Sequence, residues 1–370
     1  MQAAEMQARA LPDADPGSRC ARNRTMDVLK AFGIISIVLA HATPPGIVVE
    51  VVQIYYIAIF FFVSGYLFKP EYFSDLGMLA RRRLLPLYAV FVAWNLSYLV
   101  YEIGIVTPLL RPFGVDLGLN HEIAFAPRAA AAIILKGSAY SMGGALWFIT
   151  SLITATALFG LIGALARRLP ERASWVFIRA AVLACFFVGF GESTALRWPA
   201  HADTALVGLL VLYAGFRYRE YEGRIPIVPL IAVLCAAEVF LLRGQVDMTV
   251  DTYAGVAAFF ISVGSGIYAL LFAASRLQNS RLLSDIGRNT LFIAATHFLA
   301  FKLVALAHIA IKHLSITELG QFPTIADGTW WVAYFMAGIA IPLAVKMRLV
   351  DPALEAWHSR RATRTPRSAV

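Results

Sequence analysis

Charge is scarce in this 370-residue chain: Asp, Glu, Lys and Arg make up only 15% of the residues, whereas 59% are hydrophobic. Soluble globular proteins carry charge on about a quarter of their residues. Together with a mean hydropathy of +0.69, this shortage excludes an ordinary soluble enzyme. Cysteine is scarce too: Cys20, Cys185 and Cys235 form no CxxC pair. We therefore expect neither a disulfide framework nor a zinc cluster.

Apolar runs dominate the sequence instead, and they predict an all-α, polytopic membrane helix bundle of about ten transmembrane helices. We expect this membrane domain to cover residues 26–350. The preceding residues 1–25 have no apolar core and are expected to form a flexible cytosolic tail rather than a cleaved signal peptide. Residues 351–370 are expected to be a basic cytosolic tail. The runs lie at roughly 26–43, 51–68, 84–106, 145–165, 173–190, 204–218, 225–242, 253–275, 288–311 and 330–347.

The 32 Lys and Arg residues set the expected orientation of these helices. Most of them fall at alternate ends of the runs, on the side that also holds both termini. By the positive-inside rule, both termini are then cytosolic. Because the basic residues lie at helix ends, the net charge of +9 is read as a topology signal and not as a nucleic-acid interface. The opposite side holds only Arg111, Arg128, Lys136, Arg197, Arg243, Lys302 and Lys312.

One outer connection, residues 107–143, is longer than the others. It contains the short apolar stretch AAAAIILKG, which has too few residues to cross a bilayer. We expect this stretch to lie at the outer surface or to re-enter the bundle, as part of a lid or a substrate-binding element.

The first predicted helix carries the most informative polar residues. Ionisable groups within membrane spans are costly and are therefore candidates for function. Lys30 and His41 are 11 residues apart, about three helical turns, and so share a face that also holds Asp27. Each has a plainer interpretation: Asp27 caps the helix, Lys30 snorkels, and His41 sits at the outer interface. His41 is the best candidate for chemistry, because an imidazole is the usual proton acceptor in transfer reactions.

Other polar and aromatic positions leave two interpretations open. Arg81, Arg82 and Arg83 form either a phosphate site or a plain topology signal. Trp147 fits an interfacial aromatic belt as well as a pocket, and His297, in a mid-membrane position, fits a packing role. The sequence contains no Walker motif, GxSxG elbow, HExxH motif or dinucleotide fingerprint.

Six segments carry a resemblance to a known family. In chain order they are NRTMDVLKAFGIISIVLAH, IFFFVSGYLF, RRRLLPLY, GALWFITSLI, ADTALVGLLVLYAGFRYR and DIGRNTLFIAATHFLAF. This series resembles the integral-membrane acyltransferases of acyltransferase family 3, in particular their fucose 4-O-acetylase-like branch, over about residues 23–350. The most specific element is a basic residue, ten further residues and then His, here Lys30 and His41, with Asp27 upstream. The basic residue is Lys rather than Arg.

The resemblance implies a multi-pass protein of the bacterial inner membrane that moves acetyl from cytosolic acetyl-CoA to a hydroxyl of a sugar or lipid-linked oligosaccharide. It places the reaction in exopolysaccharide or lipopolysaccharide assembly, with membrane lipid as a partner and no metal, and it allows polysaccharide-assembly proteins as further partners. Carried over by position, His41 is catalytic and Asp27 and Lys30 are its companions. The implied contacts to the phosphates of CoA are Arg81, Arg82 and Arg83, and the implied substrate-pocket residues are Ser64, Tyr66, Trp147 and His297.

Alternatives stay open at this point. A transporter or flippase for a polysaccharide precursor would also use ten helices with buried Lys, His and Asp, and a family member without activity would serve as a scaffold. Small-molecule acceptors and acyl chains longer than acetyl remain compatible with the sequence. Direct transfer and an acetyl-His41 intermediate are both compatible with it as well.

Overall fold

The computed structural model describes residues 23–115, 126–139, 141–191 and 198–364, and nearly all of them are helical or in short turns between helices. Strands are limited, within these residues, to the antiparallel pair β1 (Val246–Asp247) and β2 (Thr252–Tyr253). The predicted tails at 1–22 and 365–370 and part of the predicted outer connection lie outside the described residues.

Seven helical segments are long and apolar enough to cross a membrane. The other three predicted spans are shorter or more polar helices: α2 (Arg24–His41), α4 (Ala58–Tyr66) and α11 (Pro229–Leu241). Each of the ten predicted runs thus has a helical counterpart, and the all-α membrane bundle is confirmed. The seven segments are Leu76–Phe113, Met142–Ala166, Glu171–Gly191, Pro199–Tyr221, Val256–Leu277, Thr290–Lys312 and Trp331–Trp357.

Two segments differ from the predicted runs. The run predicted at 51–68 is divided by turns at residues 53–57, so that only α4 is a regular membrane helix there. Conversely, the helix predicted to end at 106 continues to Phe113, past Pro108, through wider turns that tolerate the proline. The regular elements of the long segments are α5 (Leu76–Leu79), α6 (Leu85–Tyr101), α8 (Trp147–Ala166), α9 (Glu171–Gly191), α10 (Ala202–Tyr221), α12 (Val256–Leu277), α14 (Thr290–Lys312) and α15 (Trp331–Val345).

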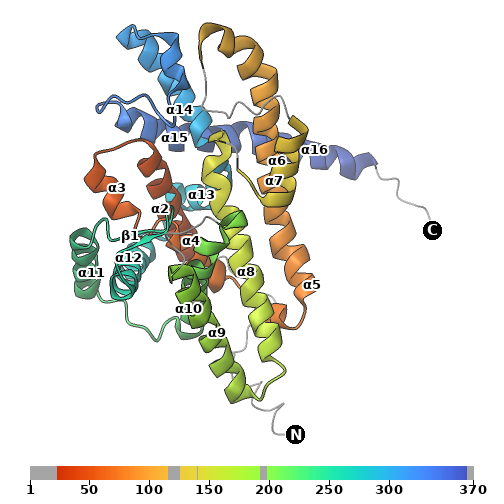
Figure 1. The fold of residues 1–370 in the computed structure, drawn as a ribbon, viewed down its shortest axis with the longest axis vertical. Coiled ribbons are helices and arrows are strands. Elements are labelled where there is room, and N and C mark those ends of the chain that lie inside the picture. The colour runs from red at the N-terminus through yellow and green to blue at the C-terminus, as the bar shows by residue number, and fades with distance from the viewer. Residues whose placement is uncertain (1–22, 116–125, 140, 192–197, 365–370) are drawn as a thin grey trace.

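The remaining helices are short or peripheral. The stretch predicted to lie at the outer surface or to re-enter the bundle forms α7 (Ala126–Lys136), which packs against α6. At the far end of the chain, α16 (Asp351–Arg364) projects from the body of the bundle (Figure 1). The others are α3 (Gly46–Val52) and α13 (Arg281–Arg288), with single-turn helices at Pro70–Phe73, Ser141–Leu146, Pro199–His201 and Ile316–Gly320.

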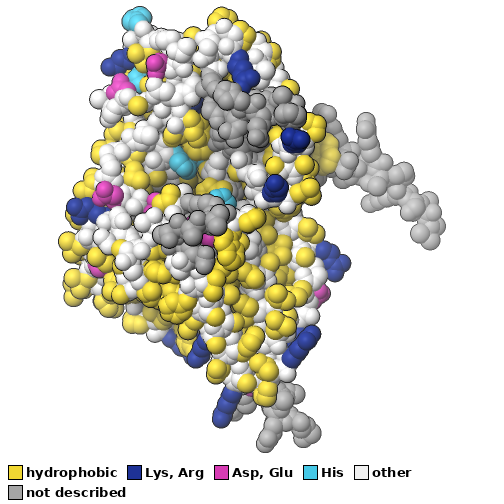
Figure 2. Space-filling view, in the orientation of Figure 1, with side chains coloured by type: hydrophobic (Ala, Val, Ile, Leu, Met, Phe, Trp, Pro, Cys, Tyr) yellow, Lys and Arg dark blue, Asp and Glu magenta, His cyan; other side chains and the backbone are white. Residues whose placement is uncertain are grey.

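The first helix, α2, lies at the centre of the helix packing. It contacts α4, α12, α13, α14 and α15, and most of its side chains between Met26 and Val38 are buried. Around it, α8, α9 and α10 pack together in the lower half of the view, and α14 packs on α15 in the upper half (Figure 1). Hydrophobic side chains cover much of the surface of that lower half, with Lys and Arg at its lower end (Figure 2). This distribution suits a lipid-facing belt.

Helices α4 and α10 approach each other very closely. A Cβ atom on Gly65 would lie 1.8 Å from the carbonyl oxygen of Leu212, and one on Gly215 would lie 1.9 Å from that of Phe62. The two helices therefore touch through their backbones, as small residues allow in membrane bundles. This contact fixes the position of α4 and of the polar residues at its end.

We predict that Gly215→Ala lowers the free energy of unfolding by about 1–3 kcal/mol or more, because the added methyl group meets backbone that cannot move aside. Gly264→Ala is the matched control, since a Cβ there meets nothing within 4 Å and alanine favours helix. Thermal unfolding of the purified proteins in detergent measures both. Equal stability of the two variants would contradict the backbone contact.

Candidate functional site

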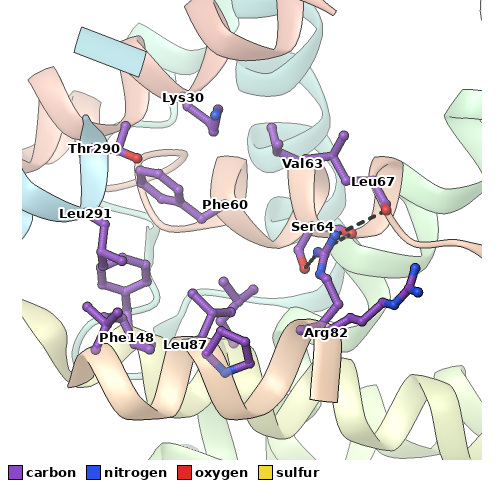
Figure 3. Close-up of a pocket in the computed structure, with 15 residues that line it drawn as sticks. Lys30, Phe60, Val63, Ser64, Leu67, Arg82, Leu87, Phe148, Thr290 and Leu291 are labelled. Atoms are coloured by element: carbon purple, nitrogen blue, oxygen red, sulfur yellow. Dashed lines mark hydrogen bonds between the residues drawn. The ribbon is translucent and has the colours of Figure 1, made fainter. Parts of the chain in front are cut away.

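A cavity of about 430 Å³ lies between α2, α4, α6, α8 and α14. Its walls are mostly apolar, and its charged lining residues are Lys30, Arg82 and Arg83. Figure 3 shows Lys30 and Arg82 on different walls, and the Phe60 ring on the side of Thr290 and Leu291. The apolar side chains include Phe60, Val63, Leu67, Leu87, Val90, Phe148, Ile149, Leu152 and Leu291, and Ser64 and Thr290 add hydroxyl groups.

Lys30 reaches the cavity from the first half of α2. Its Nζ lies 2.9 Å from Oδ1 of Asp27, one turn earlier, and the carboxylate is buried. Asp27 also lies in the first turn of the helix, where the helix dipole favours a negative charge. The predicted grouping of Asp27 with Lys30 is therefore present as an ion pair at the wall of the cavity.

The three consecutive arginines occupy different positions. Arg83 donates to the carbonyl oxygen of Leu67 at 3.2 Å and to Oγ of Ser64 at 3.3 Å, and so ties the end of α4 to the start of α6. Arg81 donates back to the Gly77 carbonyl at 3.2 Å and does not line the cavity. Arg82 is exposed and lines the cavity, and within the described residues no hydrogen bond or ion pair holds it. Arg82 is thus the arginine available for an anion.

His41, the last residue of α2, lies next to His297 of α14. Nδ1 of His41 is 3.2 Å from Nε2 of His297, and the two rings are nearly parallel with centroids 5.2 Å apart. His297 is fully buried, whereas His41 is partly exposed. Phe298 packs against both rings, at 4.0 Å from His297 and 4.9 Å from His41 between centroids. The structure thus brings together two histidines that lie 256 residues apart in sequence.

The connection between α14 and α15 lies against this histidine pair. Phe322 of the connection packs on Phe298 at 4.7 Å, and Thr324 hydrogen-bonds Thr43, two residues after His41, at 2.7 Å. The connection is anchored by buried Lys302, whose Nζ donates to the Leu319 carbonyl at 3.0 Å. A substrate that approached His41 from this side would meet the connection first.

Asp327, in the same connection, accepts hydrogen bonds from the Thr329 side chain and backbone N–H. These bonds are the main cause of a lowered pKa for its carboxyl group. Its other oxygen lies 3.1 Å from Nε2 of His308 on α14, which adds a further polar tie between the connection and the bundle.

Three of the four predicted substrate-pocket residues, Tyr66, Trp147 and His297, lie outside the cavity. Tyr66 accepts a hydrogen bond from Asn23 at 2.6 Å and donates to Glu222, so it joins the start of α2 to the end of α10. Trp147, the first residue of α8, packs against the His201 ring at 4.5 Å. Ser64 does line the cavity, where its Oγ is 3.3 Å from Thr156.

The cavity and the histidine pair lie toward opposite ends of α2. Eleven residues separate Lys30 from His41, about 16 Å along a helix, and neither histidine lines the cavity. Between them the Phe60 ring lies against Gly33, where an added Cβ would be 2.9 Å from the ring. Gly33 thus makes room for the Phe60 ring beside α2.

Sequence reasoning missed the apolar lining of the cavity and the anchored connection. Phe148 lies beside the recognised position Trp147, and Leu291 lies within the segment that contains His297, but hydropathy alone does not tell a cavity wall from a lipid-facing surface. Lys302 did give a signal, since a lysine within an apolar span needs a partner. Within the described part of the chain, no cluster of His, Cys, Asp and Glu could hold a metal ion.

Comparison with protein families finds that a family model described as an acyltransferase domain, of acyltransferase family 3, matches residues 23–347. No curated protein and no solved structure matches the chain. The family match covers both the cavity and the histidine pair.

We predict that Arg83→Ala lowers the free energy of unfolding by about 1–3 kcal/mol, because three hydrogen bonds from a charged group to the end of α4 are lost. Arg81→Ala is the control, because it removes one solvent-exposed hydrogen bond to the preceding helical turn. Its free energy of unfolding should change by less than about 0.5 kcal/mol. Thermal unfolding in detergent measures both. A loss of the same size in the two variants would mean that Arg83 does not tie α4 in place.

Proposed function

The chain belongs to acyltransferase family 3, and from that premise we propose that this multi-pass membrane acyltransferase is an acetyl-CoA-dependent O-acetyltransferase of the bacterial inner membrane. Its acceptor is a hydroxyl of a sugar or lipid-linked oligosaccharide in exopolysaccharide or lipopolysaccharide assembly. The observation that carries the proposal is the arrangement along α2, with a basic cavity near its start and a partly exposed histidine at its end.

Three features of the cavity support a CoA donor. Free Arg82 and nearby Lys30 offer positive charge to phosphate groups, and a guanidinium group binds phosphate with two hydrogen bonds. The apolar walls beyond them suit the extended pantetheine arm. Because Lys and Arg favour the cytosolic side, this end of the bundle would face the cytosolic pool of acetyl-CoA.

His41 suits the chemistry of the transfer. As a general base it accepts the proton of the acceptor hydroxyl while the oxygen attacks the thioester carbonyl carbon. The C–O ester bond forms, the C–S bond breaks, and the proton passes from His41 to the departing sulfur of CoA. In the second route, a nitrogen of His41 attacks the thioester carbonyl carbon, the C–S bond breaks and CoA leaves as a thiolate. The hydroxyl oxygen then attacks the acetyl carbon, the C–N bond breaks, and the hydroxyl proton passes to the thiolate.

We predict that Arg82→Ala raises the KM for acetyl-CoA about tenfold, equivalent to about 1.4 kcal/mol, and leaves kcat and thermal stability nearly unchanged. Arg81→Ala, the neighbouring arginine outside the cavity, is the matched control and should keep the wild-type KM. Steady-state kinetics of the purified enzyme measures both. Equal KM values in the two variants would remove Arg82 from the donor site.

We predict that His41→Ala abolishes acetylation without abolishing polymer export. The acetyl content of the surface polysaccharide is compared in cells with the wild-type gene, without the gene and with His41→Ala. Acetyl should be lost equally in the two defective strains, and the purified wild-type protein should consume acetyl-CoA. If acetyl content is unchanged and the polymer disappears, the protein is a transporter or flippase instead.

A further inference from the structure

The hydrogen bonds of His297 determine which of its nitrogens carries the proton. Its Nδ1 lies 3.1 Å from the carbonyl oxygen of Ile293 and 3.0 Å from that of Ala294. A carbonyl oxygen only accepts hydrogen bonds, so Nδ1 must be the donor. The neutral ring then carries its lone pair on Nε2.

This lone pair in turn determines the tautomer of His41. Nε2 of His297 is 3.2 Å from Nδ1 of His41, and an acceptor on one side of this bond requires a donor on the other. The proton of neutral His41 therefore lies on Nδ1, which leaves the lone pair on Nε2. A ring with the proton on Nε2 would instead place two lone pairs against each other.

We propose that His297 is a positioning residue that holds His41 in the Nδ1–H tautomer and so presents Nε2 of His41 to the substrate as the reactive atom. This inference rests on the proposed function. It holds for both routes, because Nε2 accepts the hydroxyl proton in direct transfer and takes the acetyl group in the second route.

A neutral imidazole suits this role inside a membrane bundle. In soluble triads a carboxylate usually orients the histidine, but a carboxylate here would be a buried charge whenever His41 is neutral. His297 accepts the Nδ1–H bond without a charge of its own. When His41 takes up a proton, the same bond becomes a stronger, charge-assisted one.

Aromatic rings around the two histidines hold their imidazole rings in place. Phe298 packs against both imidazoles, and Phe301 meets the His297 ring edge-on at 5.5 Å between centroids. His297 has no exposed surface, so water does not compete for its Nε2. Within the described residues, the His41 ring forms its hydrogen bond with His297.

The test compares three variants on α14. In His297→Gln the amide oxygen can still accept from Nδ1 of His41, whereas His297→Leu removes the acceptor. We expect kcat to fall about 10- to 1,000-fold in His297→Leu, as expected for a misplaced tautomer, and to stay within about tenfold of wild type in His297→Gln. The KM for acetyl-CoA should change less than about twofold in both, because the basic residues lie about 16 Å along α2 from His41.

His308→Leu is the matched control for the loss of a buried histidine. His308 lies on the same helix and is also fully buried and hydrogen-bonded, to Asp327 and Tyr334, but not to His41. Its kcat should stay near wild type. If kcat falls as far in His297→Gln as in His297→Leu, the acceptor atom of His297 is not what His41 needs. If kcat falls as far in His308→Leu as in His297→Leu, the loss comes from removing a buried histidine and the inference is wrong.

Nitrogen-15 NMR of histidine-labelled protein tests the tautomer without any transfer assay. His41→Ala identifies the signals of His41 among the seven histidines. We expect protonated Nδ1 and unprotonated Nε2 in the wild type, and a mixture of tautomers in His297→Leu. A proton on Nε2 of wild-type His41 overturns the inference even if acetyl transfer is confirmed, and the expected spectrum supports it even if the acceptor is not a glycan.

Discussion

Lipid solvates a polar side chain poorly, so ionisable groups inside this bundle are stabilised by partners in the protein. The central helix shows this constraint at both ends. Near its start, Asp27 neutralises Lys30, and at its end His41 bonds His297. Outside α2, Arg83 and Lys302 bind the backbone carbonyls of neighbouring segments. These pairings fix how α2, α4, α6 and α14 lie relative to one another.

The backbone contact between α4 and α10 makes the polar arrangement possible. With glycine at 65 and 215, the two helices approach until their backbones touch. The end of α4 then reaches Arg83, whose bonds to Ser64 and Leu67 shape one wall of the cavity. Arg83 is held in this way, whereas its neighbour Arg82 makes no such bonds within the described residues and faces the cavity. A packing contact between two helices thus determines which arginine is available to a ligand.

Relations within one helix could be predicted from the sequence, whereas relations between helices could not. Helical periodicity placed Asp27, Lys30 and His41 on one face, and the ion pair of Asp27 with Lys30 agrees with that placement. Nothing in the two separate apolar runs specifies that His41 meets His297. The arginine triplet was treated as one site, although successive residues on a helix point about 100° apart. Hydropathy also could not separate α4 from the turns before it, because both are apolar.

The length of α2 imposes a further condition on acyl transfer. Lys30 and His41 are held about 16 Å apart along the helix by its regular backbone hydrogen bonds, so the acetyl-CoA donor that we propose has to bridge this distance. Phe60, packed on Gly33, lies between the two ends. Its ring packs against Phe148 at 5.2 Å between centroids, and both rings belong to the cavity wall. The cavity and the histidine pair are thus lined by different side chains, and α2 is the element that the two have in common.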